Sequence, residues 1–391
     1  MKIAYGFSNC SDQKYKQIVG EKKAFVMVTD QKYHGLLIRG IIQNGVEVKC
    51  YSGLPINREI SNKLIIREQD DIENGIQYHY YTTVNLPIVR QIMIFLSGFF
   101  NILFSKNAYK CIICDYMSIM NTFGMGLAAK IKKIPIIEIV MDLPGLMKTT
   151  GETVRGVYKI IANLSSGFVL LTQQMNEVVN KQNKPYIVLE GHVDCALQKV
   201  PMNERWEYTT GKRVVIYAGG IHKVFGIENL VHGFIKASIA NSELRIFGDG
   251  DYREELESIC KDHANIKYMG VIDNKEIVWQ EQRAALLVNP RPSAPIYTKY
   301  SFPSKNMEYM VSGTPVLTTK LPGMPDEYKQ YVYTIDKETT EGISDALQKV
   351  FHYTFEERCV NAEKAREFVL EHKNNNTQAA KILHLLSRLS V

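Results

Sequence analysis

The sequence has little of what marks unusual protein classes. Its 26 Gly and 13 Pro among 391 residues are too few for collagen or a disordered low-complexity chain. Seven scattered Cys, an odd number, exclude a disulfide framework and fit a reducing compartment. Hydrophobic residues make up 45% and charged residues 23%, which are ordinary globular proportions. The composition predicts a folded cytoplasmic protein, and its length predicts two domains.

The excess of positive over negative charge is also small. The first 195 residues carry 22 Lys and Arg against 16 Asp and Glu, and the remaining 196 carry 25 of each. So small an excess does not suggest a nucleic-acid partner, and no zinc-finger, RRM or helix-turn-helix signature is present. The basic first half would suit an anionic membrane surface or a phosphorylated ligand, and it is equally typical of a plain soluble surface.

Apolar, β-branched runs alternate with helix-period segments, which is typical of parallel α/β sheets. Strands are expected at 2–6, 46–51, 110–115, 134–140, 167–171, 185–189, 213–218, 244–247, 266–269, 285–288 and 315–318. Helices are expected at 32–43, 118–132, 173–183, 226–238, 252–263, 275–283, 304–310, 340–351 and beyond 355. The polar stretch 195–212 is predicted to be an interdomain linker. Two such domains would offer a ligand the loops at the carboxyl ends of their strands.

The segment 87–104 is almost wholly apolar. Its five polar residues fall within an arc of about 120°, which leaves a wide apolar face that includes Phe99, Phe100 and Leu103. The charge-free part, about 14 residues, is too short to span a bilayer comfortably. The segment is therefore either a buried core helix or an interfacial helix on a membrane, and the basic first half favours the membrane.

The strongest local signal runs from Ser301 to Val316. Pro303-Ser304 stands at the start of a helix, where free backbone N–H groups and the helix dipole favour a phosphate. Lys305 adds a cation, and Glu308, one turn further, can accept hydrogen bonds from a diol such as a ribose. An ordinary helix N-terminus is the alternative interpretation.

This region resembles the retaining glycosyltransferases of family 4, which have the GT-B fold. Glu308 matches the second Glu of their Glu-x7-Glu motif, and Ser312-Gly313-Thr314-Pro315-Val316 matches the Ala-x-Gly-x-Pro-Val that follows it. Tyr217-Ala218-Gly219-Gly220 is similar to their Gly-rich loop, and the run ending in Gly248-Asp249-Gly250 to their Gly-Asp-Gly. Asp142 follows the strand after which the family has His-Asp, and 190–194 resembles its Asn-Gly-Val-Asp. The resemblance extends over nearly the whole chain.

The resemblance implies two facing Rossmann-like domains with a C-terminal helix that crosses back to the first. The expected boundaries are an acceptor-binding domain at 1–195, a nucleotide-sugar-binding domain at 196–371, and the returning helix at 372–391. Donor-binding residues are then Gly219, Gly220, Lys223, Gly248, Tyr300, Ser301, Phe302, Ser304, Lys305 and Glu308. Catalytic candidates are Asp142, Arg291, Lys305 and Glu308, and the acceptor-side residues are Glu190 and His192.

Two departures from the family pattern matter. Tyr300 stands where the family has its first Glu, so the identity of the sugar cannot be transferred from the resemblance. The usual diphosphate-binding Arg and Lys would fall on Gly220 and Phe225. Lys223, Arg291 and Lys305 are the cations available instead, and the guanidinium fork of Arg suits two phosphate oxygens.

The sequence thus predicts a retaining, metal-independent hexosyl- or N-acetylhexosaminyltransferase that uses a nucleotide sugar, with UDP favoured over GDP or ADP. The expected acceptor is a glycan or a polyprenyl-linked glycan of cell-surface polysaccharide synthesis, and the protein is placed in the cytoplasm or on the inner face of the membrane. A nucleotide-sugar epimerase and a catalytically silent nucleotide-sugar-binding subunit remain as alternatives. No metal and no other cofactor is expected, because Lys and Arg can supply the positive charge at the phosphate. Cys111 and Cys114 lie within a predicted strand and no second pair exists, which argues against a zinc site.

Overall fold

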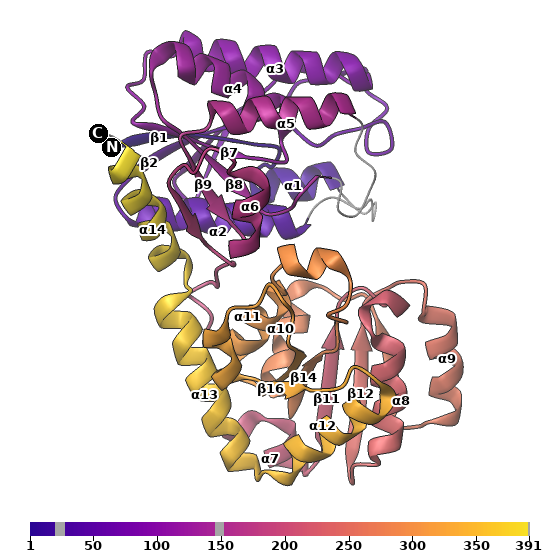
Figure 1. Cartoon of the computed structure of the whole chain (residues 1–391). Coiled ribbons are helices and arrows are strands. Elements are labelled where there is room, and N and C mark those ends of the chain that lie inside the picture. Colours follow the sequence, from indigo (N-terminus) through magenta and orange to yellow (C-terminus); the bar gives the residue numbers. More distant parts are fainter. Residues whose placement is uncertain (20–27, 145–151, 390–391) are drawn as a thin grey trace. The chain divides into compact units, whose positions relative to one another are not determined.

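The computed structural model describes residues 1–19, 28–144 and 152–389. The chain forms two compact units (Figure 1). Unit 1 comprises residues 1–192 together with 374–391, and unit 2 comprises residues 193–373. The final segment therefore belongs to the first unit although the second precedes it in the sequence.

Unit 1 is built on an eight-stranded sheet. Its strands pair in parallel except at one edge, where the last strand is antiparallel. In spatial order they are β10 (Tyr186–Val188), β9 (Gly167–Leu170), β8 (Ile136–Val140), β7 (Cys111–Asp115), β1 (Lys2–Phe7), β2 (Glu47–Ser52), β5 (Ile76–Tyr80) and β4 (Asp71–Glu73). A separate antiparallel pair consists of β3 (Ile65–Ile66) and β6 (Thr83–Val84).

Helices cover both faces of this sheet (Figure 1). One face packs against α2 (Val28–Gln43) and α14 (Asn375–Leu389), and the other against α3 (Pro87–Leu103) and α4 (Ile119–Lys132). Because side chains alternate along a strand, Ile3 and Tyr5 lie in the first core and Ala4 lies in the second. The other helices are α1 (Asp12–Val19), α5 (Glu152–Leu164) and α6 (Asn176–Val179). Unit 1 is thus a three-layer, Rossmann-like domain.

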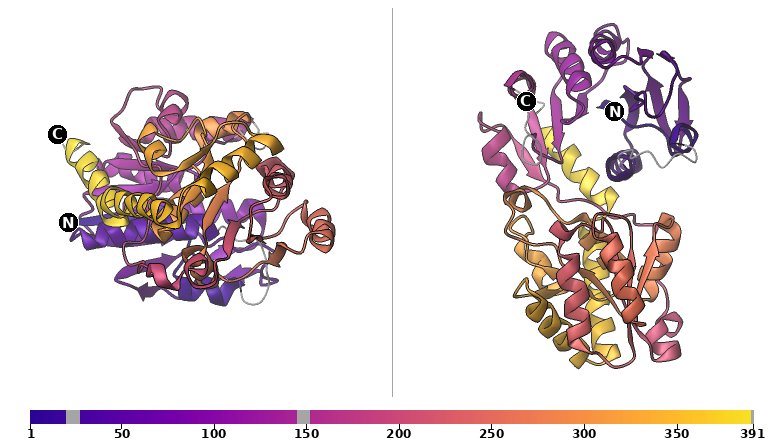
Figure 2. Two further views of the ribbon diagram at one scale, coloured as in Figure 1. Left: turned by 90° about the horizontal axis from the view of Figure 1, so that it is seen from below. Right: turned by 90° about the vertical axis from the view of Figure 1, so that its right-hand side faces the viewer.

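The last helix completes the core of unit 1. Ile382 and Leu385 are fully buried against Leu37 and Ile38 of α2. Gln378 of α14 donates a hydrogen bond to the carbonyl of Gly191 (2.8 Å). This bond holds the helix beside the end of residues 1–192, the first segment of unit 1. In the right-hand view of Figure 2 the last yellow helix lies among the elements of unit 1.

Unit 2 is built on a six-stranded, wholly parallel sheet. In spatial order its strands are β13 (Ile266–Gly270), β12 (Ser242–Phe247), β11 (Arg213–Ala218), β14 (Leu286–Asn289), β15 (Val316–Thr319) and β16 (Tyr333–Ile335). Its helices are α7 (Trp206–Thr210), α8 (Ile227–Ala237), α9 (Arg253–Asp262), α10 (Asn274–Arg283), α11 (Ser304–Ser312), α12 (Thr340–His352) and α13 (Phe355–His372). Helix α8 packs against α12, and α11 packs against α10 and α13. This unit is also Rossmann-like.

The sequence-based expectations were wrong in three places. The predicted linker 195–212 is packed into unit 2: Arg205 is buried and its Nη2 donates to the carbonyl of Gly313 (2.6 Å). Strands β3, β4, β5, β6 and β16 were not anticipated, and the helix expected at 173–183 is limited to a 3₁₀ turn and the single turn α6. Among the described residues, no helix combines the length and apolar character that crossing a bilayer requires.

Candidate functional site

The carboxyl ends of β11 and β12 form a glycine-lined edge in unit 2. The N–H of Gly219 donates to the carbonyl of Phe247 (2.9 Å), and the N–H of Gly248 donates to that of Gly270 (2.8 Å). A Cβ at Gly248 would overlap with the Gly219 carbonyl oxygen, and its φ of +128° also favours glycine. The two loops therefore lie backbone against backbone, which leaves room for a ligand to approach the main chain.

Helix α11 begins beside this edge with exposed donors. Its N-cap is Pro303, and no side chain of the described chain caps the helix, so its first N–H groups are available to an anion. Asn306 fixes this helix start, because its amide donates to Thr318 Oγ1 (3.1 Å) and accepts from Asn289 Nδ2 (2.9 Å). The hydroxyl of Tyr309 accepts from the Ala218 N–H (3.1 Å) and ties the helix to the end of β11.

Lys305 lies over the glycine loop. A Cβ added at Gly219 would overlap with its Nζ, and Nζ lies 4.9 Å from the ring centroid of Tyr217. Burial lowers the pKa of Lys305 to about 8, while the carboxylates of Glu308 and Glu281 act in the opposite direction. The fold therefore holds a desolvated ammonium group against the turn that follows β11.

Arg291 supplies a second cation from the loop after β14. Its guanidinium carbon lies 5.4 Å from the ring centroid of Phe225 and 5.0 Å from that of Tyr297. Its Nε is buried and has no hydrogen-bond partner among the described residues. Its charge also contributes to the lowered pKa of Lys305, so the two cations lie within electrostatic reach of each other.

Glu308 lies one helical turn beyond Lys305 on α11 and is partly buried. The charge of Glu308 raises the pKa of Lys305, so this carboxylate lies within electrostatic reach of the ammonium group. Three of the expected site residues, Gly219, Arg291 and Glu308, are thus brought together around a fourth, Lys305.

Other expected donor-site residues lie differently. The ammonium of Lys223 is paired with Glu255 (2.6 Å) on the exposed surface. Phe302 is buried and packs on the ring of Tyr328 at 5.0 Å between centroids, so its side chain is part of the core. Tyr300 is partly exposed, Ser304 is exposed at the start of α11, and the Ser301 hydroxyl is buried without a partner among the described residues.

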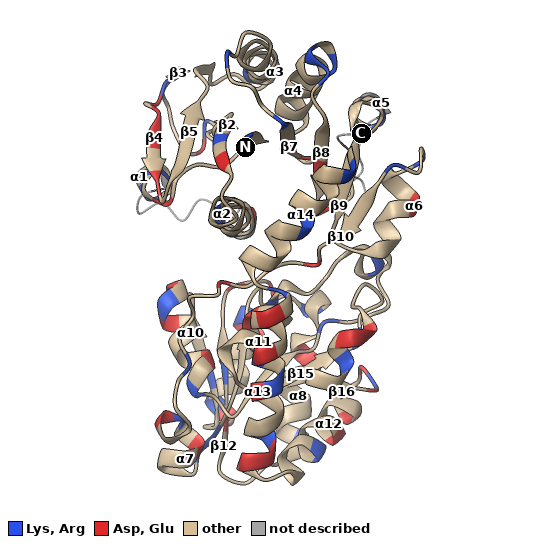
Figure 3. Cartoon of the chain, turned by 90° about the vertical axis from the view of Figure 1, so that its left-hand side faces the viewer, with Lys and Arg blue, Asp and Glu red and all other residues tan. Residues whose placement is uncertain are grey.

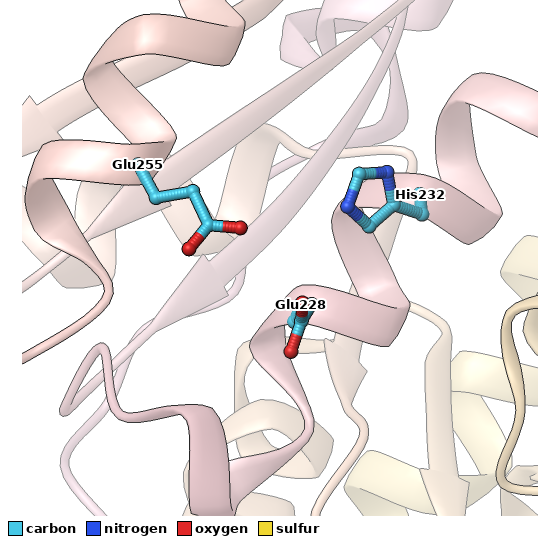
Figure 4. A group of neighbouring side chains, drawn as sticks. All are labelled: Glu228, His232 and Glu255. Carbon is cyan, nitrogen blue, oxygen red and sulfur yellow. The ribbon is translucent and has the colours of Figure 1, made fainter.

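One cluster has the composition of a metal site. Glu228 and His232 lie one turn apart on α8, and Glu255 lies on α9, with their ligand atoms within 4.8 Å of one another (Figure 4). Such a Glu-His-Glu set could hold a divalent cation. Here, however, the ammonium of Lys223 already bonds Glu255, and that charge would oppose a metal ion.

A second group of polar residues lies at the carboxyl edge of the unit 1 sheet. Asp115 ends β7, the exposed Asp142 follows β8, and Asp30 lies on α2. Burial raises the pKa of Asp30 to about 6, and the charges of Asp115 and Asp142 contribute. Three carboxylates therefore share this edge, and their repulsion adds to the effect of burial on Asp30.

His34 extends this group into the core. Its Nδ1 is hydrogen-bonded to the Tyr5 hydroxyl (2.6 Å), and its Nε2 lies 4.0 Å from Asp115 Oδ1. Burial lowers its pKa, which favours the neutral imidazole. Sequence reasoning missed Asp30, His34 and Asp115. The available signal was an Asp at the end of each of two neighbouring strands.

Glu190 and His192, expected on the acceptor side, lie in unit 1, where Glu190 is buried and His192 is partly buried. His192 Nε2 is 2.8 Å from the carbonyl oxygen of Tyr33, and the two rings lie 4.4 Å apart. Burial lowers the pKa of His192 to about 4, so its imidazole is neutral at physiological pH. The ring of His192 therefore packs on Tyr33.

The comparisons with known proteins agree with this architecture. Residues 212–352 match the family model described as "Glycosyl transferases group 1". Sucrose-phosphate synthase from Thermosynechococcus elongatus is similar over 99% of this chain and 98% of its own, with a TM-score of 0.69 and 15% identity. HepE from Anabaena in complex with UDP is similar over 99% of this chain and 100% of its own, with a TM-score of 0.67 and 14% identity.

The catalytic domain of starch synthase IV from Arabidopsis thaliana, bound to ADP and acarbose, has a TM-score of 0.69 at 11% identity, over 100% of this chain and 99% of its own. None of the curated proteins compared with the sequence matches it. The structural similarities cover the whole chain and establish the GT-B fold, so the predicted fold class is confirmed.

Proposed function

We propose that the protein is a retaining glycosyltransferase that uses a nucleotide diphosphate sugar as its donor. The observation that carries the proposal is the pair of cations, Lys305 and Arg291, beside the exposed N-terminus of α11, within the segment that matches the glycosyl transferases group 1 model. The transferred group is a hexosyl or N-acetylhexosaminyl unit. The acceptor is a glycan or a polyprenyl-linked glycan of cell-surface polysaccharide synthesis.

In this proposal the diphosphate binds unit 2 at the start of α11. The N–H groups of Ser304 and Lys305 and the backbone at Gly219 and Gly220 contact its oxygens, as expected for an anion at a helix N-terminus. Glu308 accepts hydrogen bonds from the ribose hydroxyls. We favour UDP as the nucleotide, and HepE, which shares the fold over its full length, was solved with UDP. ADP is the alternative, because starch synthase IV was solved with ADP.

The chemical step is the departure of the nucleoside diphosphate from a sugar that develops oxocarbenium character. Negative charge accumulates on the leaving phosphate, and the charges of Lys305 and Arg291 are placed to stabilise it without a metal ion. Binding the diphosphate also removes the cost of keeping two like charges close together. For retention, the leaving phosphate oxygen takes the proton of the attacking acceptor hydroxyl on the same face of the sugar.

The test is a panel of UDP, GDP and ADP sugars in which nucleoside diphosphate release is measured with and without lipid-linked acceptors. Lys305→Ala and Arg291→Ala should each lower kcat about 10²-fold, by analogy with the removal of one electrostatic stabiliser. Lys236→Ala and Arg253→Ala are matched controls, because both side chains are exposed, paired cations on helices of the same unit. They should retain full activity.

Three outcomes would contradict the proposal. Conversion of a nucleotide sugar without an acceptor would identify an epimerase. Tight nucleotide binding without turnover on any acceptor of the panel would identify a silent nucleotide-sugar-binding subunit. Full activity in both Lys305→Ala and Arg291→Ala would show that the phosphate lies elsewhere.

A further inference from the structure

Helix α3 carries an exposed apolar stripe. Ile88, Ile92, Leu96, Phe100 and Phe104 follow one another at intervals of four residues, and their exposed fractions range from 41% to 77%. Side chains that are four residues apart are neighbours on a helix surface. The five side chains therefore form one continuous band from the first turn of α3 to Phe104, the residue that follows its end. The rings of Phe100 and Phe104 stack at 5.7 Å between centroids. So large an apolar band on a helix surface points to a binding partner.

The exposure of the stripe does not result from loose packing of α3, because the opposite side of this helix is closely packed. Ile94, Gly98 and Ile102 are buried. A Cβ on Gly124 of α4 would overlap with the carbonyl of Phe95, so the two helix backbones are in close contact. The apolar face expected from the sequence was partly wrong: Phe99 and Leu103 pack against the core, and only Phe100 of that trio belongs to the stripe.

The segment that contains α3 and α4 is strongly basic. Residues 87–137 contain six Lys and Arg and one acidic residue, the buried Asp115, so they account for most of the net charge of +6. Lys106, Lys110, Lys130 and Lys133 are exposed. Lys132 Nζ donates to the carbonyls of Ile102 (3.2 Å) and Ser105 (2.8 Å), which joins the basic end of α4 to the end of α3. In Figure 3 neither helix carries an acidic residue.

We propose that this α3–α4 surface, the five-residue stripe together with Lys106, Lys110, Lys130 and Lys133, binds an anionic lipid bilayer. An apolar face bordered by lysines is the arrangement by which an interfacial helix inserts its side chains among acyl chains while cations contact the headgroups. A second copy of the chain is a poor occupant, since two such faces would bring lysines together without any carboxylate. The proposal goes beyond the proposed transferase activity and does not depend on it.

The experiment is co-sedimentation of the full-length protein with vesicles of phosphatidylglycerol and phosphatidylcholine, and with phosphatidylcholine alone. Binding is expected only to the anionic vesicles and should weaken with added salt. Phe100→Ser with Phe104→Ser should reduce partitioning at least about tenfold, because two exposed apolar anchors are lost. Ile72→Ser with Val360→Ser is the matched control, since both side chains are exposed outside this surface, and it should bind like the wild type.

Charge is tested separately. Lys130→Gln with Lys133→Gln should reduce binding about tenfold, and the corresponding Arg variants should retain it. Unchanged melting temperatures and UDP affinities would show that the substitutions act on the membrane contact alone. The proposal would be overturned by equal binding to neutral vesicles, by unchanged binding of the Phe100 and Phe104 double variant, or by a wild type that ignores vesicles and self-associates through the stripe.

Discussion

Replacing Lys305 with Met should make the protein more stable and a poorer nucleotide binder. Burial lowers the pKa of Lys305 from 10.5 to about 8, so at neutral pH the fold retains an ammonium group in an environment that disfavours it. A shift of that size corresponds to at most about 3 kcal/mol of unfolding free energy. Met has a similar shape without the charge, so a gain of about 1–3 kcal/mol is expected at pH 7.

The gain must depend on pH in a definite direction. The pKa in the folded state lies below that in the unfolded state, so the cost of the charge is fully present below pH 8. As the pH rises from 8 toward 10.5 the folded protein loses this charge, and the difference between wild type and Lys305→Met should disappear. Urea unfolding at pH 7 and pH 10 measures both ends, with the exposed Lys236→Met as the control that should change little.

Lys305→Met should bind nucleotide more weakly, although it is expected to be more stable. Loss of a charged hydrogen bond to phosphate costs about 1.5–3 kcal/mol, so Lys305→Met should bind UDP roughly tenfold to a hundredfold more weakly at pH 7. Between pH 7 and 9 the wild-type affinity should fall about tenfold as the free ammonium deprotonates, while that of the variant follows only the ionisation of UDP. Calorimetry on both proteins distinguishes the effect of Lys305 deprotonation from that of UDP ionisation. A variant that is less stable at pH 7, or that binds UDP with wild-type affinity, would refute the reasoning.

Three further outcomes are expected. Glu308→Ala should raise the Kd for UDP at least about tenfold by calorimetry, and Glu308→Gln less, if the carboxylate binds the ribose; equal affinities would remove that role. Arg291→Lys should fail to restore the kcat lost in Arg291→Ala, because an ammonium cannot stack between Phe225 and Tyr297 as a guanidinium does. Treatment with EDTA, or the substitution His232→Ala, should leave steady-state turnover unchanged; a loss restored by a divalent ion would contradict metal-independent catalysis.

The repeating strands and helices could be predicted because buried parallel strands have continuous apolar runs. Strand β5, with the sequence Ile-Gln-Tyr-His-Tyr, has polar residues at alternate positions and was missed, as was β16, which has only three residues. The stretch around Arg205 was taken for a linker because its composition is polar. Its burial depends on a carbonyl at Gly313, which lies 108 positions away in the sequence and is brought near only by the tertiary fold.

The candidate site also has a part that could be predicted from the sequence and a part that could not. Lys305 and Glu308 belong to one local motif at the start of one helix, so their proximity follows from the sequence. Of the two aromatic rings beside Arg291, Tyr297 is six residues away, but Phe225 is distant in the sequence and no local pattern links it to Arg291. The ion pair of Lys223 with Glu255, which lies 32 residues away, could not be foreseen either.

The return of α14 to unit 1 has a consequence for the order in which the protein folds during synthesis. Unit 2 is one continuous segment, so all its contacts are available once Lys373 has been made. The first part of unit 1 is made before unit 2 yet lacks part of its core, including Ile382 and Leu385, until α14 has left the ribosome. The second unit should therefore reach its native state before the first, although domains usually fold in the order of their synthesis. Until then the nascent first unit exposes the apolar face of α2 and depends on protection from aggregation.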